Sequence, residues 1–323
     1  MSNNSLVYSN ARVKAMENSF LTNEKIVRMA YSDSLEEGFR VLLESSYGGG
    51  LVVDAKDYDA LLQTEDARVS EFVLEAMPSG QGMESFVIKN DYHNLKAIVK
   101  GKYMRLDDVD FMLMPKGSFD PKEVKDMVYA DDYSVLTDLQ KTALLEIDSA
   151  RANGNTSPRF IDLTLDKACY KEIMSSLKKV KNKFMPKYWQ TNIDMMNISC
   201  FVRACNAGDK TLFDESFIDG GKLEKRFFTG ELSGVLDKLA YTSYPQIAEA
   251  LKTGDFVAFE RIWDNTLLNI FKDERNDIFS VAPIAGFYVA KKIEIKIVRM
   301  ICILLKNDVD KDVIRDRLRE LYA

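Results

Sequence analysis

Proline and glycine, the residues that interrupt helices most strongly, are scarce in this sequence. Only 7 prolines and 16 glycines occur among 323 residues, whereas leucine, lysine, glutamate, aspartate and methionine are frequent. Proline and glycine destabilise a helix interior more than any other residue, so their scarcity favours long helices. Because 46% of the residues are hydrophobic, the chain can also bury a large core. The composition therefore predicts a globular, all-α protein.

The sequence also lacks a long apolar run. Its most apolar stretch, near residues 297–305, is interrupted by Arg299 and falls well short of the roughly 20 residues that cross a bilayer. The N-terminal segment shows no basic region followed by an apolar core, which a secretory signal would need. We therefore expect no direct membrane span and a cytoplasmic location.

Residues suited to metal, redox or nucleotide chemistry are few. His93 is the only histidine, and the four cysteines, at positions 169, 200, 205 and 302, show no Cys-x-x-Cys spacing. The glycine-rich segments at 47–51 and 80–85 lack the lysine or the third glycine of nucleotide-binding loops. No catalytic, metal-binding or cofactor-binding residue is predicted, and no cofactor is expected.

Charges of the two signs are mixed along the chain, with 44 basic and 50 acidic residues and a net charge of −6. This balance provides no basic surface for a phosphate backbone, so no nucleic-acid partner is expected. The segment 178–189 interleaves lysines with aromatic residues and is interpreted as a solvated helical face rather than as a base-stacking or membrane-surface element. The acidic residues at 308–312 lack the glycine and glutamate of a calcium loop and are interpreted as a capped helix start.

An internal repeat is present. Three segments, DYHNLKAIVKGK from Asp91, DMMNISCFVRAC from Asp194 and EIKIVRMICILL from Glu294, each begin with an acid, and their starts are 103 and 100 residues apart. Matching apolar positions follow at the i, i+3, i+4 spacing of a buried helical stripe. Two further segments, MPKGSFDPKEV from Met114 and IDGGKLEKRFF from Ile218, match at nearly the same period.

These matches predict three related helical repeats of about a hundred residues each, the spacing at which the motif segments recur. The repeats are placed at 1–105, 106–208 and 209–323 with approximate boundaries, and the N- and C-terminal helices are free to pack together.

One position of the repeat carries two cations. In the register of the three motif segments, Lys96, Ser199 and Arg299 each follow the first apolar stripe residue directly, which places them about 100° away around the helix. We expect these side chains to leave the core. Lys96 and Arg299 are therefore the candidate partner-binding residues. The alternative is that each forms an intramolecular ion pair or covers apolar surface with its stem.

Several segments resemble the C subunits of archaeal and bacterial V-type and A-type ATPases, a family similar to the d subunit of eukaryotic V-ATPases. The resemblance covers the whole chain and rests on YSNARVKAMENSFL near the start, SSYGGGL ending at Leu51, PIAGFYVAKKIEIKIVRMICILLKN from Pro283, and the final VIRDRLRELYA. One departure is Ile297, which stands where the two internal copies have Asn94 and Asn197 and where family members usually have asparagine. That departure concerns local packing.

The resemblance implies an all-helical funnel of three bundles with pseudo-threefold symmetry. It also implies a non-catalytic rotor subunit of the central stalk, a socket that receives the shaft made by the D and F subunits and sits on the membrane ring of proteolipid (c or K) subunits. Such a protein is a monomer when isolated, associates with the membrane peripherally through the complex, and transmits torque for proton or sodium transport or for ATP synthesis.

Two other functions are compatible with the sequence. The first alternative is a soluble helical-repeat scaffold with other partners, which would not bind a D–F shaft. The second is a carboxylate-dependent hydrolase, which would show turnover by the isolated chain. The absence of a nucleotide-binding loop in the sequence predicts that ATP is not hydrolysed by the isolated chain.

Overall fold

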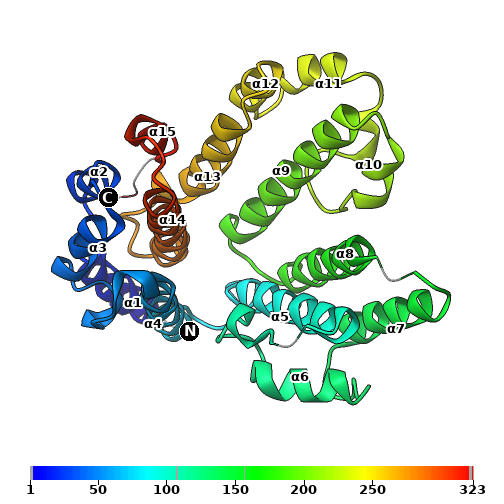
Figure 1. Ribbon diagram of the computed structural model, residues 1–323, viewed down its shortest axis with the longest axis horizontal. Helices are drawn as coiled ribbons and strands as arrows, with labels where there is room; N and C mark the ends of the chain where they lie inside the picture. Colours follow the sequence, from blue (N-terminus) through cyan, green and yellow to red (C-terminus); the bar gives the residue numbers. More distant parts are fainter. Residues whose placement is uncertain (1–2, 107, 156, 320–321, 323) are drawn as a thin grey trace. The chain divides into compact units, whose positions relative to one another are not determined.

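The computed structural model describes residues 3–106, 108–155, 157–319 and 322 (Figure 1). Its regular elements are helices, and no strand occurs within these ranges. This confirms the predicted all-α class. The chain forms two compact units, one from residues 1–78 together with 236–323 and the other from residues 79–235.

The first unit brings the two ends of the chain together around helix α14 (Ala282–Lys306). Within the unit, α14 packs against α1, α2, α3, α4 and α13, and α15 packs against α2. A helix covered by neighbours on most sides is apolar nearly all round, which explains the sequence of α14. The other elements are α1 (Asn3–Glu17), α2 (Asn23–Ala30), α3 (Leu35–Glu44), η1 (Tyr47–Gly50), η2 (Ala55–Asp57), α4 (Tyr58–Ala76), α12 (Pro245–Lys252), α13 (Phe256–Lys272) and α15 (Lys311–Asp316).

The second unit is continuous in sequence. Helix α8 (Pro158–Leu177) packs against α5 (Glu84–Met104), α7 (Asp138–Ala152) and α9 (Phe184–Asn206), while α6 (Pro121–Tyr129) packs on α5 and α10 (Thr211–Ser216) packs on α9. The short elements are η3 (Asp110–Met112) and η4 (Lys225–Phe228). Helix α11 (Leu232–Leu239) crosses the division between the two units.

The three motif segments lie on the long helices α5, α9 and α14. Every residue at the first three stripe positions is at most 3% exposed, as the spacing predicted: Leu95, Ile98, Val99, Ile198, Phe201, Val202, Val298, Ile301 and Cys302. At the fourth position Leu305 is buried, whereas Lys102 and Cys205 are partly exposed. The apolar stripe of the repeat is therefore a core feature.

An asparagine on two of these helices fixes the loop that follows. The side chain of Asn197 donates a 2.8 Å hydrogen bond to the carbonyl of Ile218 and accepts one of 2.9 Å from its N–H. Asn94 makes the same pair of bonds with Met114, at 3.0 and 2.7 Å. Because a buried backbone group needs a partner, one amide side chain satisfies both groups of the loop residue.

The acid that begins each motif holds the same loop a few residues further on. Asp91 accepts from the Ser118 N–H at 2.7 Å, and Asp194 accepts from the Leu223 N–H at 2.9 Å. The loops approach so closely that a Cβ on Gly221 would lie 2.3 Å from the Asp194 carboxylate. Gly117 faces Asp91 in the same way. The two matching loop segments thus share contacts as well as sequence.

The third motif helix makes a related contact with the start of the chain. Glu294 of α14 accepts a 2.7 Å hydrogen bond from the N–H of Leu21, which precedes α2. Ile297, at the asparagine position, is 1% exposed and has no amide to offer the loop. These contacts support related helical units, while the division at 1–105, 106–208 and 209–323 stays a prediction.

Within the described ranges, no helix combines the length and apolar character needed to cross a bilayer. Even α14, the most apolar long helix, carries charged side chains in its interior.

Replacing Asn197 by alanine should destabilise the second unit. The Ile218 N–H and carbonyl would lose their buried partner, which costs about 2–4 kcal/mol for the two groups together. Denaturant unfolding followed by circular dichroism measures the loss. As a control, Asn153→Ala removes an exposed amide that bonds only within its own helix end and should change stability by less than about 0.5 kcal/mol. Equal losses in the two variants would contradict the loop-holding role.

Candidate partner-binding site

Lys96 lies on α5 and forms an ion pair with Asp166 of α8. Its ammonium is 2.5 Å from the Asp166 carboxylate, and the two side chains are 22% and 19% exposed. Lys89, nearly two turns earlier on α5, approaches the same carboxylate at 3.8 Å, and Lys100, one turn later, pairs with Asp162. The cations of α5 therefore lie along its contact with α8.

Arg299 lies on α14 and pairs with Asp59 of α4 at 3.1 Å, with side chains 43% and 57% exposed. An ion pair this open to water contributes little to stability, because solvent screens it and both side chains lose rotamer freedom. The exposed guanidinium therefore keeps donors available for other acceptors.

The expectation that all three aligned side chains leave the core is wrong for Ser199, which is 8% exposed. A small hydroxyl can be buried at this position without a charge to solvate, whereas the long cationic side chains of Lys96 and Arg299 reach the surface. Both cations form the intramolecular pairs that were the alternative to partner binding, and partner binding by them stays a proposal.

The same face of α5 and α14 carries further basic residues in register. Where Lys96 aligns with Arg299, Lys89 aligns with Lys292 and His93 aligns with Lys296. Lys292 pairs with Asp66, and Lys296 pairs with Asp264 at 2.8 Å. Residues four and three apart share one face of a helix, so each helix presents a basic stripe flanked by aspartates.

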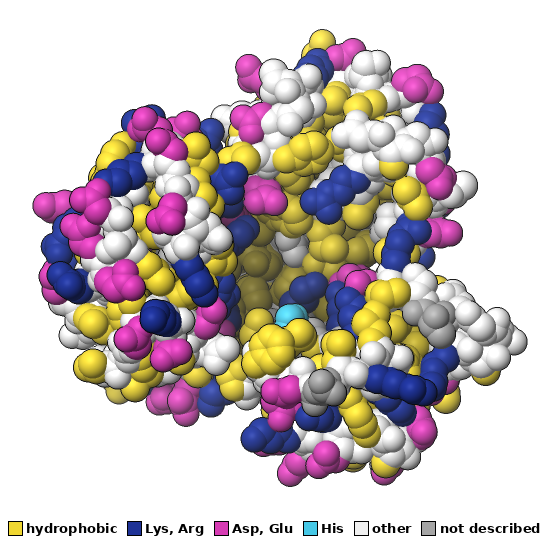
Figure 2. Space-filling view, in the orientation of Figure 1, with side chains coloured by type: hydrophobic (Ala, Val, Ile, Leu, Met, Phe, Trp, Pro, Cys, Tyr) yellow, Lys and Arg dark blue, Asp and Glu magenta, His cyan; other side chains and the backbone are white. Residues whose placement is uncertain are grey.

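Such a stripe can attract a partner but offers little for catalysis. Ion pairs between partly exposed groups can exchange one carboxylate for another, and the resulting attraction weakens as salt rises. Figure 2 shows how closely cations and acids are mixed on one face of the molecule. The stripe therefore suits recognition of an acidic protein surface.

The side chains that could carry chemistry are inert or isolated. His93 is exposed, and its Nε2 lies 3.0 Å from the Met112 carbonyl. Burial raises the pKa of the Cys169 and Cys302 thiols to about 12, which keeps them protonated and unreactive at neutral pH. In the part of the chain that the structure describes, no three His, Cys, Asp or Glu residues are grouped to hold a metal.

The lysine-rich segment 178–189 was predicted to be one helical face, and this is wrong for its first half. Residues 178–183 connect α8 to α9, which begins at Phe184. The lysines are exposed, as expected, but Phe184 and Trp189 are at most 6% exposed. Buried rings cannot stack on bases, so residues 178–183 form a solvated connection, and Phe184 and Trp189 at the start of α9 belong to the core.

A buried charge network lies beside the basic stripe of α14. Lys291 has a fully buried side chain, and its ammonium lies 2.7 Å from Glu294, 3.2 Å from Glu65 and 2.7 Å from the carbonyl of Ser19. Glu65 also accepts bonds from Arg68, at 2.8 and 3.0 Å. Two carboxylates and two cations thus compensate one another in the first unit.

The network also holds the glycine-rich segment at 47–51. Glu65 accepts a 3.2 Å hydrogen bond from the Gly48 N–H. Gly48 has a φ of +63°, and a Cβ there would lie 2.5 Å from the Leu61 side chain. Only glycine fits this left-handed, crowded position without strain. The Gly48 N–H is therefore used to hold this segment against α4, through Glu65.

Burial raises the pKa of Glu294, although Lys291 and the Leu21 N–H oppose the rise. Desolvation favours the neutral carboxyl, and a nearby cation favours the charged one. Sequence reasoning missed this network because Lys291 and Lys292 are neighbours of the same type, and only the fold shows which of them is buried. The acid that opens each motif was the one available signal.

Residues 9–317 match the model of the ATP synthase (C/AC39) subunit family, a family of non-catalytic subunits of rotary ATPases. Since the match spans most of the chain, the chain belongs to this family. It is similar to the C subunit of the V-type sodium ATPase of Enterococcus hirae, at 20% identity over 97% of this chain and 98% of the relative.

Two archaeal relatives are also similar, and both are named as the C subunit of an A-type ATP synthase. The one from Methanocaldococcus jannaschii is 26% identical, with 90% of this chain and 80% of the relative aligned. The one from Pyrococcus abyssi is 26% identical, with 97% and 90% aligned. The resemblance identified from the sequence motifs is thereby confirmed over nearly the full length.

Lys291→Met should destabilise the first unit by about 3–5 kcal/mol, because it leaves the carboxylates of Glu65 and Glu294 buried with one compensating cation fewer. Denaturant unfolding near neutral pH measures the loss. Lys296→Met on the same helix is the control: Lys296 is 52% exposed and Asp264 keeps Arg319 as a partner, so the loss should not exceed about 1 kcal/mol.

The deficit of the Lys291→Met variant should also shrink as pH falls. A carboxyl whose folded-state pKa is raised binds protons more tightly when folded, so stability increases as pH drops through that pKa. Unfolding at about pH 5 and about pH 7.5 compares the two conditions within the range in which a raised carboxyl titrates. A deficit that grows toward low pH would exclude uncompensated carboxylates as its cause.

Proposed function

We propose that this chain is the C subunit of a V-type or A-type rotary ATPase, acting as a non-catalytic rotor component of the central stalk. It would form a socket between the shaft made by the D and F subunits and the membrane proteolipid ring, and transmit torque for ion transport or ATP synthesis. The observation that carries the proposal is the family match over residues 9–317, together with relatives named as C subunits that align over nearly their whole length.

The packing of the chain is suited to a mechanical role. A close-packed interior deforms little under load, and the helices α5, α9 and α14 are each held by buried stripes and by side-chain bonds to connecting segments. We propose that the three predicted repeats form the three bundles of a pseudo-threefold funnel. A stiff funnel would pass rotation between shaft and ring without absorbing it.

We further propose that Lys96 and Arg299 contribute to the partner-facing surface. The support is their equivalent position on α5 and α14, the matching cations Lys89 and Lys292, and the exposure of Arg299. In a funnel with approximate threefold symmetry, equivalent positions face the same partner from two bundles. An acidic segment of the shaft or ring is the partner that such a surface would attract.

Membrane association would then be peripheral. We propose that the protein is held on the cytoplasmic side through the ring and not by a segment of its own, so that washing without detergent releases it. The isolated chain is expected to be a monomer, because one copy serves each rotor.

The purified chain should bind a D–F complex from the same organism and should not hydrolyse ATP by itself. Isothermal titration calorimetry with the D–F complex, and phosphate release by the chain alone, measure these two properties. Absence of D–F binding by folded, monomeric chain would favour the helical-repeat scaffold, and ATP turnover that persists through purification would favour a hydrolase.

The double variant Lys96→Gln/Arg299→Gln should weaken binding to the partner that faces these residues, and the effect should be largest at low salt, where charges are least screened. Binding of D–F complex and of detergent-solubilised ring is measured separately. The matched control, Asp166→Asn/Asp59→Asn, breaks the same two ion pairs but changes the net charge in the opposite direction.

The two variants separate recognition from structure. If the cations serve the partner, the lysine and arginine variant binds more weakly and the aspartate variant binds as well as the wild type or better. If the two variants lose the same amount of stability and both bind the D–F complex and the ring as tightly as each other, the ion pairs are purely structural. The proposed role of Lys96 and Arg299 is then wrong.

A further inference from the structure

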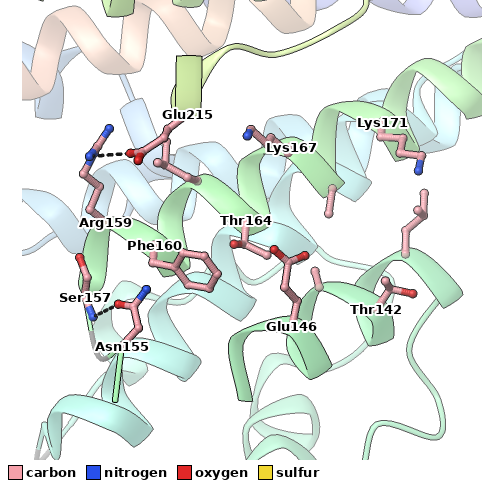
Figure 3. A pocket seen from close by; sticks show the side chains of 14 residues that line it. Thr142, Glu146, Asn155, Ser157, Arg159, Phe160, Thr164, Lys167, Lys171 and Glu215 are labelled. Carbon is pink, nitrogen blue, oxygen red and sulfur yellow. Dashed lines mark hydrogen bonds and ion pairs between the residues drawn. The ribbon is translucent and has the colours of Figure 1, made fainter. Parts of the chain in front are cut away.

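A groove runs between α7 and α8 in the second unit, and its lining includes no residue of the basic stripes. Its volume is about 530 Å³. It is lined on one side by Leu139, Thr142, Ala143 and Glu146 of α7, and on the other by a ridge of α8 from Arg159 to Lys171. Figure 3 shows Glu146, Phe160 and Thr164 directed into the space between the two helices.

The spacing of the lining residues gives the groove its shape. The α7 residues recur at i, i+3, i+4 and i+7, so they share one face over two turns. The α8 ridge from 159 to 171 is about 18 Å long at 1.5 Å per residue. Its floor is apolar but incompletely covered, since Leu139, Phe160, Leu163 and Ala168 remain half-buried. The groove therefore has the length and character of a seat for a short helix.

At one end of the groove the cation of α8 already has an acidic partner. Arg159 pairs with Glu215 of α10 at 3.0 Å, as Figure 3 shows. The other two cations of the ridge, Lys167 and Lys171, are exposed and have no ion pair or hydrogen bond within the described residues. They lie four residues apart, on one face of α8, and form the basic rim of the groove.

A hydroxyl and a carboxylate also line the groove. Thr164 is 9% exposed and lines the floor, and its hydroxyl is not one of the buried polar atoms that lack a partner. Glu146, on the opposite rim, is exposed and has no cationic partner in the described ranges. The groove thus offers an apolar floor with one hydroxyl, and rims of opposite sign.

We propose that this groove binds an amphipathic helix of a partner protein. The helix lays apolar residues on Phe160 and Leu163 and places two carboxylates, one turn apart, against Lys167 and Lys171. Because the two rims carry opposite charge, the acidic side of the partner helix lies over α8, and not over Glu146 of α7. This proposal is independent of the coupling role, because it uses neither Lys96 nor Arg299.

Charge complementarity favours a helix over a small molecule. A single small anion could satisfy one lysine, but the apolar floor and the two lysines extend along the same α8 ridge. An occupant that is apolar on one side and acidic at i and i+4 matches both features at once, and amphipathic helices present side chains at that spacing.

Two hydrocarbon-stapled helical peptides of about 16 residues, enough to span the ridge at 1.5 Å per residue, test the proposal. Both carry leucines at i, i+3, i+4 and i+7, and they differ only in having glutamates or lysines at the positions beside that stripe. Each peptide is labelled with fluorescein, and binding to the full chain is measured by fluorescence anisotropy at two salt concentrations.

The acidic peptide should bind, the basic peptide should bind at least about tenfold more weakly, and the difference should narrow at high salt. Lys167→Glu/Lys171→Glu should reverse the preference between the two peptides. The control variant Lys178→Glu/Lys179→Glu makes the same charge change at exposed lysines outside the groove and should leave the preference unchanged. Phe160→Ser should weaken binding of the acidic peptide without altering the response to salt.

Several results would overturn the proposal. The first is failure of the acidic peptide to bind the folded wild-type chain, and the second is equal binding of the two peptides. The third is a change of peptide preference in the Lys178→Glu/Lys179→Glu control as large as that in the Lys167→Glu/Lys171→Glu variant. Binding of a dansylated fatty acid or of phosphatidylserine vesicles at Lys167 and Lys171, with no peptide binding, would instead assign the groove to a small amphiphile or a lipid surface. Because the D–F complex is absent from this assay, its outcome does not depend on the proposed coupling function.

Discussion

Burying Lys291 between Glu65 and Glu294 imposes a constraint on the whole first unit. Charges removed from water require partners at close range, and here the partners come from the connection before α2, from α4 and from α14 itself. The same carboxylates accept the backbone N–H groups of Leu21 and Gly48. Segments far apart in sequence must therefore reach their final positions together for any one of these charges to be compensated.

In the second unit, asparagines and acids on the long helices bond to the backbone groups of loops. Asn94 and Asn197 each satisfy both backbone groups of one loop residue, and the acids three residues earlier hold the next part of the loop. In α14 the asparagine is replaced by Ile297, and the loop contact is left to Glu294. The repeat is thus marked by a few side chains that position long helices relative to the loops beside them.

Much of the fold could be predicted because burial leaves a direct trace in sequence. The residues at 95, 98 and 99 and their counterparts are apolar for the same reason that they are buried, and helical periodicity reports that reason without any knowledge of the fold. The family could be identified because its motifs are long and distributed along the whole chain, and the match over 9–317 confirmed it.

The candidate sites were harder to predict because they depend on pairs of distant residues. Lys96 and Arg299 could be aligned from the repeat, but Asp166 and Asp59, which neutralise them, lie on other helices. The groove at Lys167 exists only because α7 packs on α8, and no pattern within either helix shows which lysines that packing leaves without partners.

The two units differ in the order in which the ribosome supplies their parts. Residues 79–235 form a continuous unit, so all of its helices are available once that stretch has been synthesised, and domains generally fold as units during synthesis. The first unit has α1 to α4 at the beginning of the chain, but the helix that covers their apolar faces, α14, is made more than two hundred residues later. For most of its synthesis the nascent chain therefore carries an apolar surface on α1 to α4 that α14 does not yet cover, and Glu65 has Arg68 as its partner but not yet Lys291.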